Sequence, residues 1–288
     1  MAMSKGPART ALAPAEVERR RAAFRALHAS GCFVIPNPWD VGSARALASL
    51  GFKALATTSA GFAWTRGRRD HRGPGREQVL AHIREMVEAT SLPLNADFRD
   101  GYADRPEGVA ESVRLCVATG VAGLSIEDDS GNPDRRLYDL PQAVERLKAA
   151  RAAIDAAGGG VLLTARSECF LTGHPDPLAE SLRRLSAYAE AGADVLYAPG
   201  PKRREEIAAI VKAAAPKPVN VIVSTAVGLS VRDLAEMGVR RISVGSALAR
   251  TAWTGFLHAA SLIAGEGSFE AFGSAVSFAD MEKLFEGD

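Results

Sequence analysis

The chain has few cysteines and no long apolar run. Only three cysteines occur, Cys32, Cys116 and Cys169, and they lie far apart without a CxxC pair or a Cys/His spacing typical of zinc ligands. We therefore expect neither a disulfide framework nor a structural zinc site, but reduced thiols in a cytoplasmic protein. No apolar stretch approaches the roughly 20 residues that span a bilayer, so a membrane protein is not expected.

The chain also lacks an excess of charge of either sign. The 288 residues contain 35 Lys and Arg against 34 Asp and Glu, a formal net charge of +1. Such a chain has no field that would attract nucleic acid or an anionic membrane. With 47% hydrophobic and 24% charged residues it can bury a large core. Its length suits two average domains or one α/β barrel, which commonly uses about 250 residues.

A repeated junction is the clearest organisation. The segments "LASLGFKAL", "VATGVAGLS", "AEAGADVLY" and "AEMGVRRIS" each end a helical pattern with Gly and enter a short apolar run. Gly suits the left-handed C-cap of a helix because it has no Cβ. Eight such runs, each followed by a helical pattern, begin at Cys32, Lys53, Pro93, Gly123, Val161, Asp194, Pro218 and Arg241. This alternation predicts an α/β protein with a single (β/α)₈ TIM barrel.

The predicted barrel occupies residues 14–250 and has a segment at each end. Residues 1–13 resemble a disordered tail, and an extra helix from Pro14 precedes the first strand and is expected to cover the barrel floor. Residues 251–288 form a helical extension rich in Phe and Trp. Exposed aromatic surface usually marks an interface, so we expect this extension to pack on a neighbouring subunit.

Polar side chains gather where the predicted strands end. They are Asn37, Asp40, Ser59, Asn95, Asp97, Glu127, Asp128, Arg166, Glu168 and Tyr197. The carboxyl ends of all strands of a barrel meet at one mouth, where active sites lie. Residues two apart share a face of a strand, so Asn95 and Asp97 point the same way. Glu127 and Asp128 point opposite ways, and only one of them can enter the mouth.

Carboxylates that converge repel one another unless a cation neutralises them. Oxygen donors without His or Cys favour Mg²⁺ or Mn²⁺. Arg166 is then expected to bind an anionic group of the substrate with two parallel hydrogen bonds. The alternative is that these groups pair among themselves in a structural layer of salt bridges.

Several motifs together resemble the isocitrate lyase/phosphoenolpyruvate mutase superfamily, in its shorter, mutase-like branch. They are "NPWDVGSARALASLGFKALATTSAGFA", "RGRRD", "PLNADFRDGYAD", "GLSIEDDSG", "LTARSECF" and "GADVLYAPG", in the order of the family. The resemblance implies a TIM barrel, Mg²⁺ or Mn²⁺, and a terminal helix exchanged between subunits of a homodimer or homotetramer. It also implies a carbon–carbon lyase or phosphonomutase-like isomerase that makes or breaks a C–C or P–C bond next to a 2-oxo acid through a metal-held enolate.

Site residues carry over by position. By resemblance, Asp70 and Glu127 match acids that hold metal-bound waters, Asp97 matches the second aspartate of a D-x-D metal pair, and Arg166 matches the substrate-binding arginine. The loop Ser59, Ala60, Gly61 matches the one whose backbone amides receive the substrate carboxylate. The catalytic candidates are therefore Arg166, Asp70 and Glu127, and the metal candidates are Asp97, Asn95, Glu127 and Asp70.

Two departures from the family pattern matter. The first D-x-D aspartate is Asn95 here, an uncharged ligand that should weaken metal binding, with Asp97 or Asp100 as possible replacements. The family's lyases carry a Cys motif in the lid after the fourth strand, but the lid here, residues 128–139, reads "DDSGNPDRRLYD". Cys169 is a conceivable substitute, although a buried inert thiol is the more common state of a free cysteine.

Three functions stay open at this point. The first is a Mg²⁺-dependent lyase or mutase acting on a small 2-oxo or enol acid, with Tyr102, Tyr138, Tyr197 or His174 as candidate proton donors. The second is a phosphate-binding barrel enzyme, suggested by "SVGSAL" at the eighth strand, since a helix N-terminus there can bind phosphate. The third is an inert relative that binds a dicarboxylate.

Overall fold

The computed structural model describes residues 12–286, so nearly all of the tail expected at residues 1–13 lies outside the described residues. The extra helix before the barrel is α1 (Pro14–Ala29), which begins where the sequence predicted. Pro14 at its first position suits a helix start, because proline lacks the N–H that has no partner there. No helix between residues 12 and 286 is long and apolar enough to cross a membrane.

The eight predicted strands form one parallel sheet. Their bounds are β1 (Phe33–Ile35), β2 (Leu55–Ala56), β3 (Leu94–Asp97), β4 (Gly123–Glu127), β5 (Leu162–Arg166), β6 (Val195–Tyr197), β7 (Val219–Ile222) and β8 (Arg241–Ser243). The strands pair in the order β1-β8-β7-β6-β5-β4-β3-β2. The backbone N–H of Ala56 donates to the carbonyl of Pro36 at 3.0 Å, which joins β2 to the end of β1. The predicted (β/α)₈ barrel is therefore confirmed.

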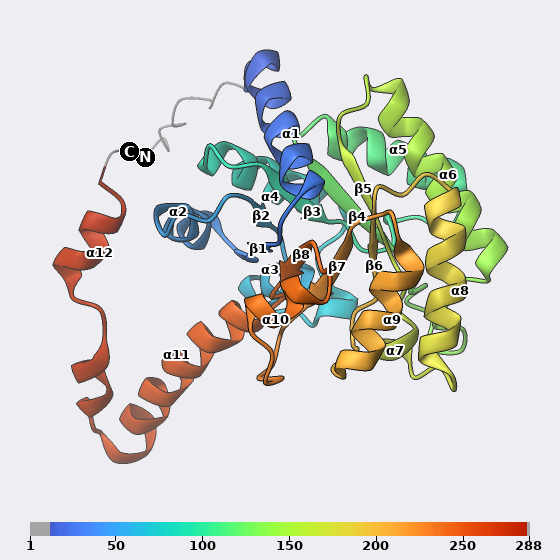
Figure 1. The fold of residues 1–288 in the computed structure, drawn as a ribbon. Helices are drawn as coiled ribbons and strands as arrows, with labels where there is room; N and C mark the ends of the chain where they lie inside the picture. The colour runs from blue at the N-terminus through green and yellow to red at the C-terminus, as the bar shows by residue number, and fades with distance from the viewer. Residues whose placement is uncertain (1–11, 287–288) are drawn as a thin grey trace.

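The helices form a ring around the strands (Figure 1). They are α2 (Val41–Ser49), α3 (Ser59–Thr65), η1 (Asp70–Arg72), α4 (Arg76–Ala89), α5 (Pro106–Val117), α6 (Leu140–Ala156), α7 (Cys169–Thr172), α8 (Pro177–Glu190), α9 (Arg204–Ala214) and α10 (Val231–Glu236). Outward side chains of the strands, such as Leu124 and Leu163, pack in one core with inward residues of the helices, such as Ile83 and Leu147. This ring fixes the strand ends that carry the polar residues.

The barrel floor lies under α1. Phe24 of α1 is fully buried in a small apolar cluster with residues from β1, β5 and β6. A Cβ on Gly123 would lie 2.7 Å from both the Phe24 ring and the Asn95 Oδ1. Only glycine therefore lets the helix and the polar interior of the barrel approach each other so closely at the start of β4.

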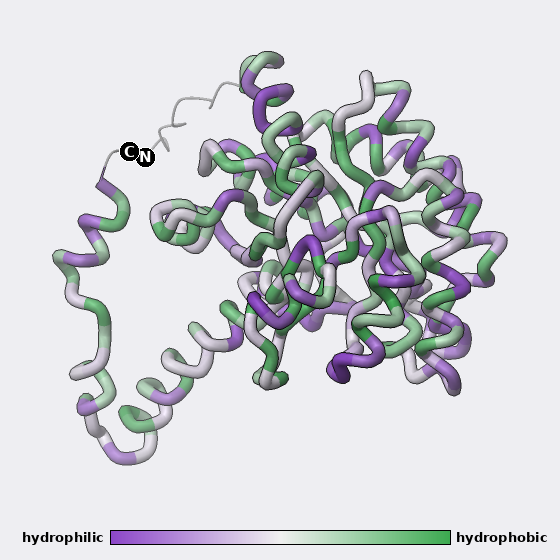
Figure 2. The backbone as a smooth tube through the Cα atoms, in the orientation of Figure 1, coloured by the Kyte–Doolittle hydropathy of each residue, from purple (hydrophilic) through white to green (hydrophobic). Residues whose placement is uncertain are grey.

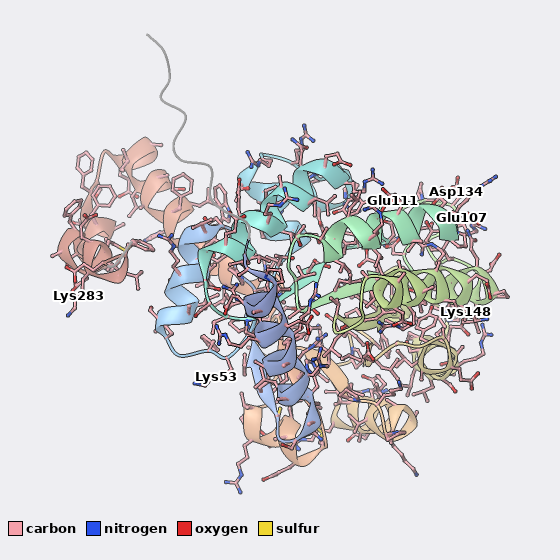
Figure 3. The ribbon with its side chains drawn as sticks, turned by 90° about the horizontal axis from the view of Figure 1, so that it is seen from above. Lys53, Glu107, Glu111, Asp134, Lys148 and Lys283 are labelled. Atoms are coloured by element: carbon pink, nitrogen blue, oxygen red, sulfur yellow. The ribbon has the colours of Figure 1, made fainter. Side chains whose placement is uncertain are left out.

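The C-terminal segment extends away from the barrel as an arm (Figure 1). We use "arm" for α11 (Ala247–Glu266), η2 (Glu270–Ser274) and α12 (Phe278–Leu284). Apolar residues lie all along it (Figure 2), and Lys283 marks its far end, remote from Lys148 on the outer surface of α6 (Figure 3). Large apolar side chains on the arm are exposed, from 37% for Trp253 to 81% for Phe278. The apolar surface of the arm is thus not covered by the barrel.

Candidate active site

Arg166 is the centre of the polar cluster at the barrel mouth. It ends β5, and its guanidinium lies 3.1 Å from a Glu127 carboxylate oxygen and 3.7 Å from one of Asp97. Its Nε also pairs with Glu168, and the guanidinium lies 5.4 Å from the centre of the Tyr197 ring. Asp97, Glu127, Arg166 and Tyr197 belong to β3, β4, β5 and β6, and Glu168 follows β5. The structure therefore brings together Asp97, Glu127 and Arg166, the three groups on which the sequence prediction depended.

Ser59 lies between two acidic residues, Asp97 at the end of β3 and Asp70. Its backbone N–H donates to Asp97 Oδ2 at 2.8 Å, and its side chain lies close enough to Asp70 to lower the pKa of that carboxyl against the effect of burial. The Asp97 N–H in turn donates to the hydroxyl of Thr57 at 2.8 Å. Asp97 is therefore held in one orientation from two sides, with Asp70 beside it.

Asp70 has a carboxylate oxygen without a partner. It begins η1, and its Oδ1 is buried with no hydrogen bond. Burial and the negative charge of Asp97 raise the pKa of Asp70. An unpaired buried oxygen beside another carboxylate is an arrangement that a cation would stabilise.

Arg99 also belongs to the site, although no pattern in the sequence predicted this. It follows β3 with a φ of +49°, and its Nη1 donates to the Asp70 carbonyl at 2.7 Å. Its charge also acts on the carboxylates of Asp70 and Glu127. Tyr102, with a φ of +55°, completes the same turn. Two non-glycine residues in the left-handed region indicate a backbone held under strain, as is common at functional sites.

The mouth contains more acidic than basic side chains. Burial raises the pKa of Glu127 well above its ordinary value, against the opposing effect of Arg166, and raises the pKa of Glu168 to about 7. Neighbouring carboxylates raise the pKa of Arg166, outweighing its own burial. Part of the cluster therefore holds protons near neutral pH, which makes proton transfer in this site chemically accessible.

Asn95 does not lie with these carboxylates. It shares a strand face with Asp97, as predicted, but it sits two residues deeper in the barrel and is buried. Its Oδ1 is 3.5 Å from Nη1 of Arg241, and its amide N–H donates to the Ala96 carbonyl at 3.2 Å. A guanidinium beside this oxygen repels a cation, so the geometry does not support Asn95 as a metal ligand.

Other residues predicted near the mouth have structural roles. Asp128 points outward, where it accepts hydrogen bonds from Arg184 and Tyr188 of α8. Asp40 caps α2 by accepting from the Ser43 N–H at 2.7 Å. Asp100 accepts from the Tyr102 N–H in the turn after β3, and burial raises its pKa.

Asn37 binds the backbone amides after β8 that a phosphate group would need. Its Oδ1 accepts from the N–H groups of Val244 and Gly245 at 2.9 and 2.8 Å. These are backbone donors just after β8, where the sequence "SVGSAL" suggested a phosphate site. Because a side chain of this chain already satisfies them, the geometry does not favour a phosphate there.

The substrate loop is partly engaged by the protein itself. The Ser59 amide binds Asp97, and the Gly61 N–H donates to the Thr58 hydroxyl at 3.3 Å. A Cβ on Gly61 would lie 2.8 Å from the Trp39 Cβ, so glycine is required here for packing. Of the three amides predicted to bind a carboxylate, the one of Ala60 has no such competing partner in the described structure.

The candidate proton donors divide into two groups. Tyr102 lines the hollow beside Asp70 and Asp97, and Tyr197 lines a cavity below Arg166; burial raises the pKa of Tyr197 to about 12. Tyr138 is buried and donates to Asp104 at 2.6 Å, whereas His174 lies in a surface turn with Asp176. Only the first two are therefore placed to reach a substrate.

Cys169 lies outside the hollows that the carboxylates line. It begins α7, is buried, and has its Sγ 3.3 Å from the Ser167 hydroxyl. Burial raises the pKa of this thiol. The environment therefore favours the neutral thiol, in agreement with the interpretation of Cys169 as inert.

The fold and the cluster define an enzyme of the TIM-barrel class with a carboxylate–arginine centre at the mouth. Residues 24–264 match the family model for phosphoenolpyruvate phosphomutase. The chain therefore belongs to this family of the phosphoenolpyruvate mutase/isocitrate lyase superfamily, whose members are lyases and phosphonomutases acting on small carboxylates and phosphonates.

Relatives of this chain include proteins with different activities. An uncharacterized protein of Mycobacterium tuberculosis (strain ATCC 25618 / H37Rv) is 33% identical over 225 residues, 77% of this chain and 81% of that protein. The 2,3-dimethylmalate lyase of Eubacterium barkeri is 28% identical over 182 residues, 60% of this chain and 61% of the lyase. A crystal structure of a candidate lyase/mutase from Burkholderia cenocepacia J2315 has a TM-score of 0.90 at 46% identity, covering 94% of this chain and 97% of that one.

Proposed function

We propose that the protein is a Mg²⁺-dependent lyase that breaks a carbon–carbon bond next to the 2-oxo group of a small carboxylic acid, or forms one there. The observation that carries this proposal is the cluster of Asp97, Glu127 and Arg166, with the unpaired Asp70 oxygen beside it. Relatives named 2,3-dimethylmalate lyase and oxaloacetate decarboxylase act on small carboxylates by their names, which supports the same class of substrate here.

The donor set fits a divalent cation in part. No group of three or more His, Cys, Asp or Glu among residues 12–286 is arranged to hold a metal alone. Asp97, Asp70 and Glu127 nevertheless offer the hard oxygen ligands that Mg²⁺ or Mn²⁺ prefers, and the unpaired Asp70 Oδ1 fits such an ion. We propose that these three residues hold the ion together with oxygens of the substrate or of water. When bound, the ion supplies Lewis acidity for charge that develops on the substrate.

The residues of this chain supply orientation and charge. In the proposed complex, Arg166 binds the substrate carboxylate through its guanidinium, and the Ala60 amide contributes a second donor. Both stabilise negative charge in the transition state. Tyr102 or Tyr197 holds the proton that the product anion needs, while Glu127 and Glu168 keep Arg166 in place. Loop 128–139 closes over the mouth and excludes water.

Phosphorus–carbon chemistry is the second candidate. The family model is that of a phosphomutase, and a structure titled as a phosphonomutase from Burkholderia cenocepacia J2315 has a TM-score of 0.78 at 34% identity. A phosphate-binding barrel enzyme is disfavoured, because the amides after β8 that it needs bind Asn37. An inert, ligand-binding relative is the third candidate, and a binding experiment separates it from both enzymes.

Calorimetry with Mg²⁺ and oxalate, which mimics the enolate of pyruvate, is the first test. We expect oxalate to bind only with the metal present, and the variant Asp97→Asn to lose this binding while its thermal midpoint is kept. A panel of 2-oxo acids, 2-hydroxy acids and phosphonates, assayed for pyruvate release, then identifies the reaction. Metal-independent oxalate binding that Asp97→Asn leaves intact would overturn the metal site. Metal-dependent binding without turnover of any panel member would favour the inert relative.

Assembly into a homodimer or homotetramer through the arm is part of the proposal. Phe256 and Phe278 expose 58% and 81% of their surface, an arrangement that burial against a second copy would stabilise. We expect the double variant Phe256→Ser/Phe278→Ser to shift the mass measured by light scattering to that of the monomer. The control is Leu50→Ser, which removes an isolated apolar residue that is 73% exposed on the barrel. A wild-type monomer would refute this part of the proposal.

A further inference from the structure

A second arginine is buried inside the barrel, below the mouth. Arg241 begins β8 and is only 3% exposed. Its Nε donates to Asn220 Oδ1 at 2.8 Å, and its Nη2 donates to the Thr164 hydroxyl at 3.1 Å. Its Nη1 has only long contacts of 3.5 Å, to His28 Nε2 and to Asn95 Oδ1. All four partners are neutral groups, and no carboxylate in the described part of the chain pairs with this guanidinium.

His28 does not supply the missing negative charge. It lies on α1 at the barrel floor, and burial together with the charge of Arg241 lowers its pKa to about 3, so the imidazole is neutral. Burial lowers the pKa of Arg241 to about 10, which still leaves it charged at neutral pH. A buried charge is expensive unless it is paired. A bound anion would therefore stabilise the buried, unpaired guanidinium of Arg241.

A cavity connects this guanidinium to the mouth. It has a volume of about 60 Å³, and its lining includes Arg241 and Asn220 as well as Ser125, Tyr197, Arg166 and Asp97. This volume is that of the whole cavity and corresponds to roughly two water molecules, so the cavity admits one carboxylate group and leaves the rest of a diacid at the mouth. The cavity therefore leads from the candidate active site to the unpaired charge.

Strand register places the polar lining in one continuous row. Arg166 is the neighbour of Tyr197 across β5 and β6, Tyr197 of Asn220 across β6 and β7, and Asn220 of Arg241 across β7 and β8. Barrel strands are tilted by about 36°, so a row along the hydrogen bonds descends from the mouth toward the floor. Arg241 is also the neighbour of Phe33 at the start of β1. The two arginines thus lie on one row of polar residues, three strands apart.

We infer that the lower part of this cavity is a binding site for a carboxylate group, held by the guanidinium of Arg241. The carboxylate belongs to the far end of a dicarboxylic substrate whose reacting end lies at Arg166, and this assignment rests on the proposed function. A free monocarboxylate can supply the same chemistry. The preference of the enzyme for diacids over monoacids then depends on Arg241, which does not contact the residues around Arg166 where the substrate reacts.

The test exploits the neutral amide beside Arg241. Asn220→Asp has the same shape and places a carboxylate 2.8 Å from Nε, where it pairs with the guanidinium inside the protein. The second oxygen accepts from the Ser243 hydroxyl, which now lies 3.0 Å from the amide nitrogen. We expect calorimetry to show formate and succinate binding weakened by roughly tenfold or more, with an unchanged or higher thermal midpoint. Gln142→Glu on α6 is the matched control for the added negative charge and should bind both acids as the wild type does.

Arg241→Gln provides an independent variant with the same expected loss. If Asn220→Asp and Arg241→Gln are folded and bind formate and succinate like the wild type, or if the wild type binds neither, the inference is wrong. Arg166→Gln distinguishes a diacid that spans both arginines from a free monocarboxylate. If succinate spans both arginines, this variant should weaken the binding of succinate but not that of formate. A loss of formate alone in Asn220→Asp would overturn the substrate assignment and leave a free-anion site. Because formate binding needs neither metal nor turnover, this result is independent of the proposed reaction.

Discussion

Two clusters of arginine and carboxylate lie on opposite sides of the same strand end. Glu127 enters the barrel mouth and lies 3.1 Å from Arg166, whereas Asp128, the next residue, points outward and lies 2.9 Å from Arg184 of α8. We call them the inner and the outer cluster. Both combine buried acids with a buried guanidinium, yet their surroundings differ, and so do their consequences.

The outer cluster is complete. Asp128 accepts hydrogen bonds from Arg184, from the Tyr188 hydroxyl at 2.5 Å and from the Glu168 N–H at 2.7 Å. Its charge is balanced and its oxygens are satisfied. The inner cluster has Asp97, Glu127 and Glu168 around the single guanidinium of Arg166, and it opens on a cavity. A satisfied cluster stabilises the fold, whereas an unbalanced cluster beside a cavity is prepared for a ligand.

The outer cluster predicts the largest effect, and it is one on stability. Asp128→Ala removes the buried carboxylate that accepts from Arg184, from the Tyr188 hydroxyl and from the Glu168 N–H, and it leaves Arg184 with Glu180 as its ion-pair partner. The unpaired buried donors should lower the free energy of unfolding by about 3 kcal/mol. Urea unfolding measures it, and activity per folded molecule should be kept. Arg183→Ala is the control, because this neighbour is 58% exposed in its side chain and its loss should cost less than about 1 kcal/mol. Equal costs in the two variants would remove the distinction between the clusters.

The inner cluster predicts the opposite result. Arg166→Gln should reduce turnover by at least about 100-fold, because it removes the donor that binds the developing charge. Stability should fall less than in Asp128→Ala, since each of the remaining acids can take up a proton. The readouts are kcat on the identified substrate and the thermal midpoint. An active Arg166→Gln variant would place the chemistry elsewhere in the barrel.

The sequence could predict the fold and part of this division. Eight apolar runs, four of them after a glycine that ends a helical pattern, begin within two residues of the observed strands. Strand alternation showed that only one of Glu127 and Asp128 enters the mouth, but it could not tell which. That choice depends on the register of β4 against β5, where Glu127 lies beside Arg166.

The sequence could not predict how deep each polar side chain lies along the barrel axis. Alternation placed Asn95 and Asp97 on one face, but a separation of two residues is roughly 6.6 Å, enough to move Asn95 from the mouth to the layer of Arg241. Arg99 was missed although it stands in the motif "ADFRDGYAD", because its left-handed backbone turns it back toward Asp70. Arg241 looked like an ordinary first residue of a strand.

A pH effect tests the surplus charge of the inner cluster. The pKa of Glu168 is raised to about 7 from an ordinary value of 4.5. Between these values the unfolded chain loses the proton that the folded protein keeps, so stability falls as pH rises from 4.5 to 7 and is level above that range. The contribution is at most about 3 kcal/mol by the linkage relation. In Glu168→Gln this part of the slope should be absent from urea unfolding series, and an unchanged slope would contradict the assignment.

The smallest effect is expected at Cys169, which follows Glu168 and packs beside Ser167 between the two clusters. Its thiol is buried, and burial raises its pKa, so the reactive thiolate is disfavoured. Cys169→Ser keeps a small side chain with a hydroxyl that can bond to Ser167, and we expect kcat within about twofold of the wild type. The same assay on Cys116→Ser, a buried thiol on α5, provides the control. A loss beyond about tenfold confined to Cys169→Ser would assign the thiol a role in proton transfer and extend the inner cluster to α7.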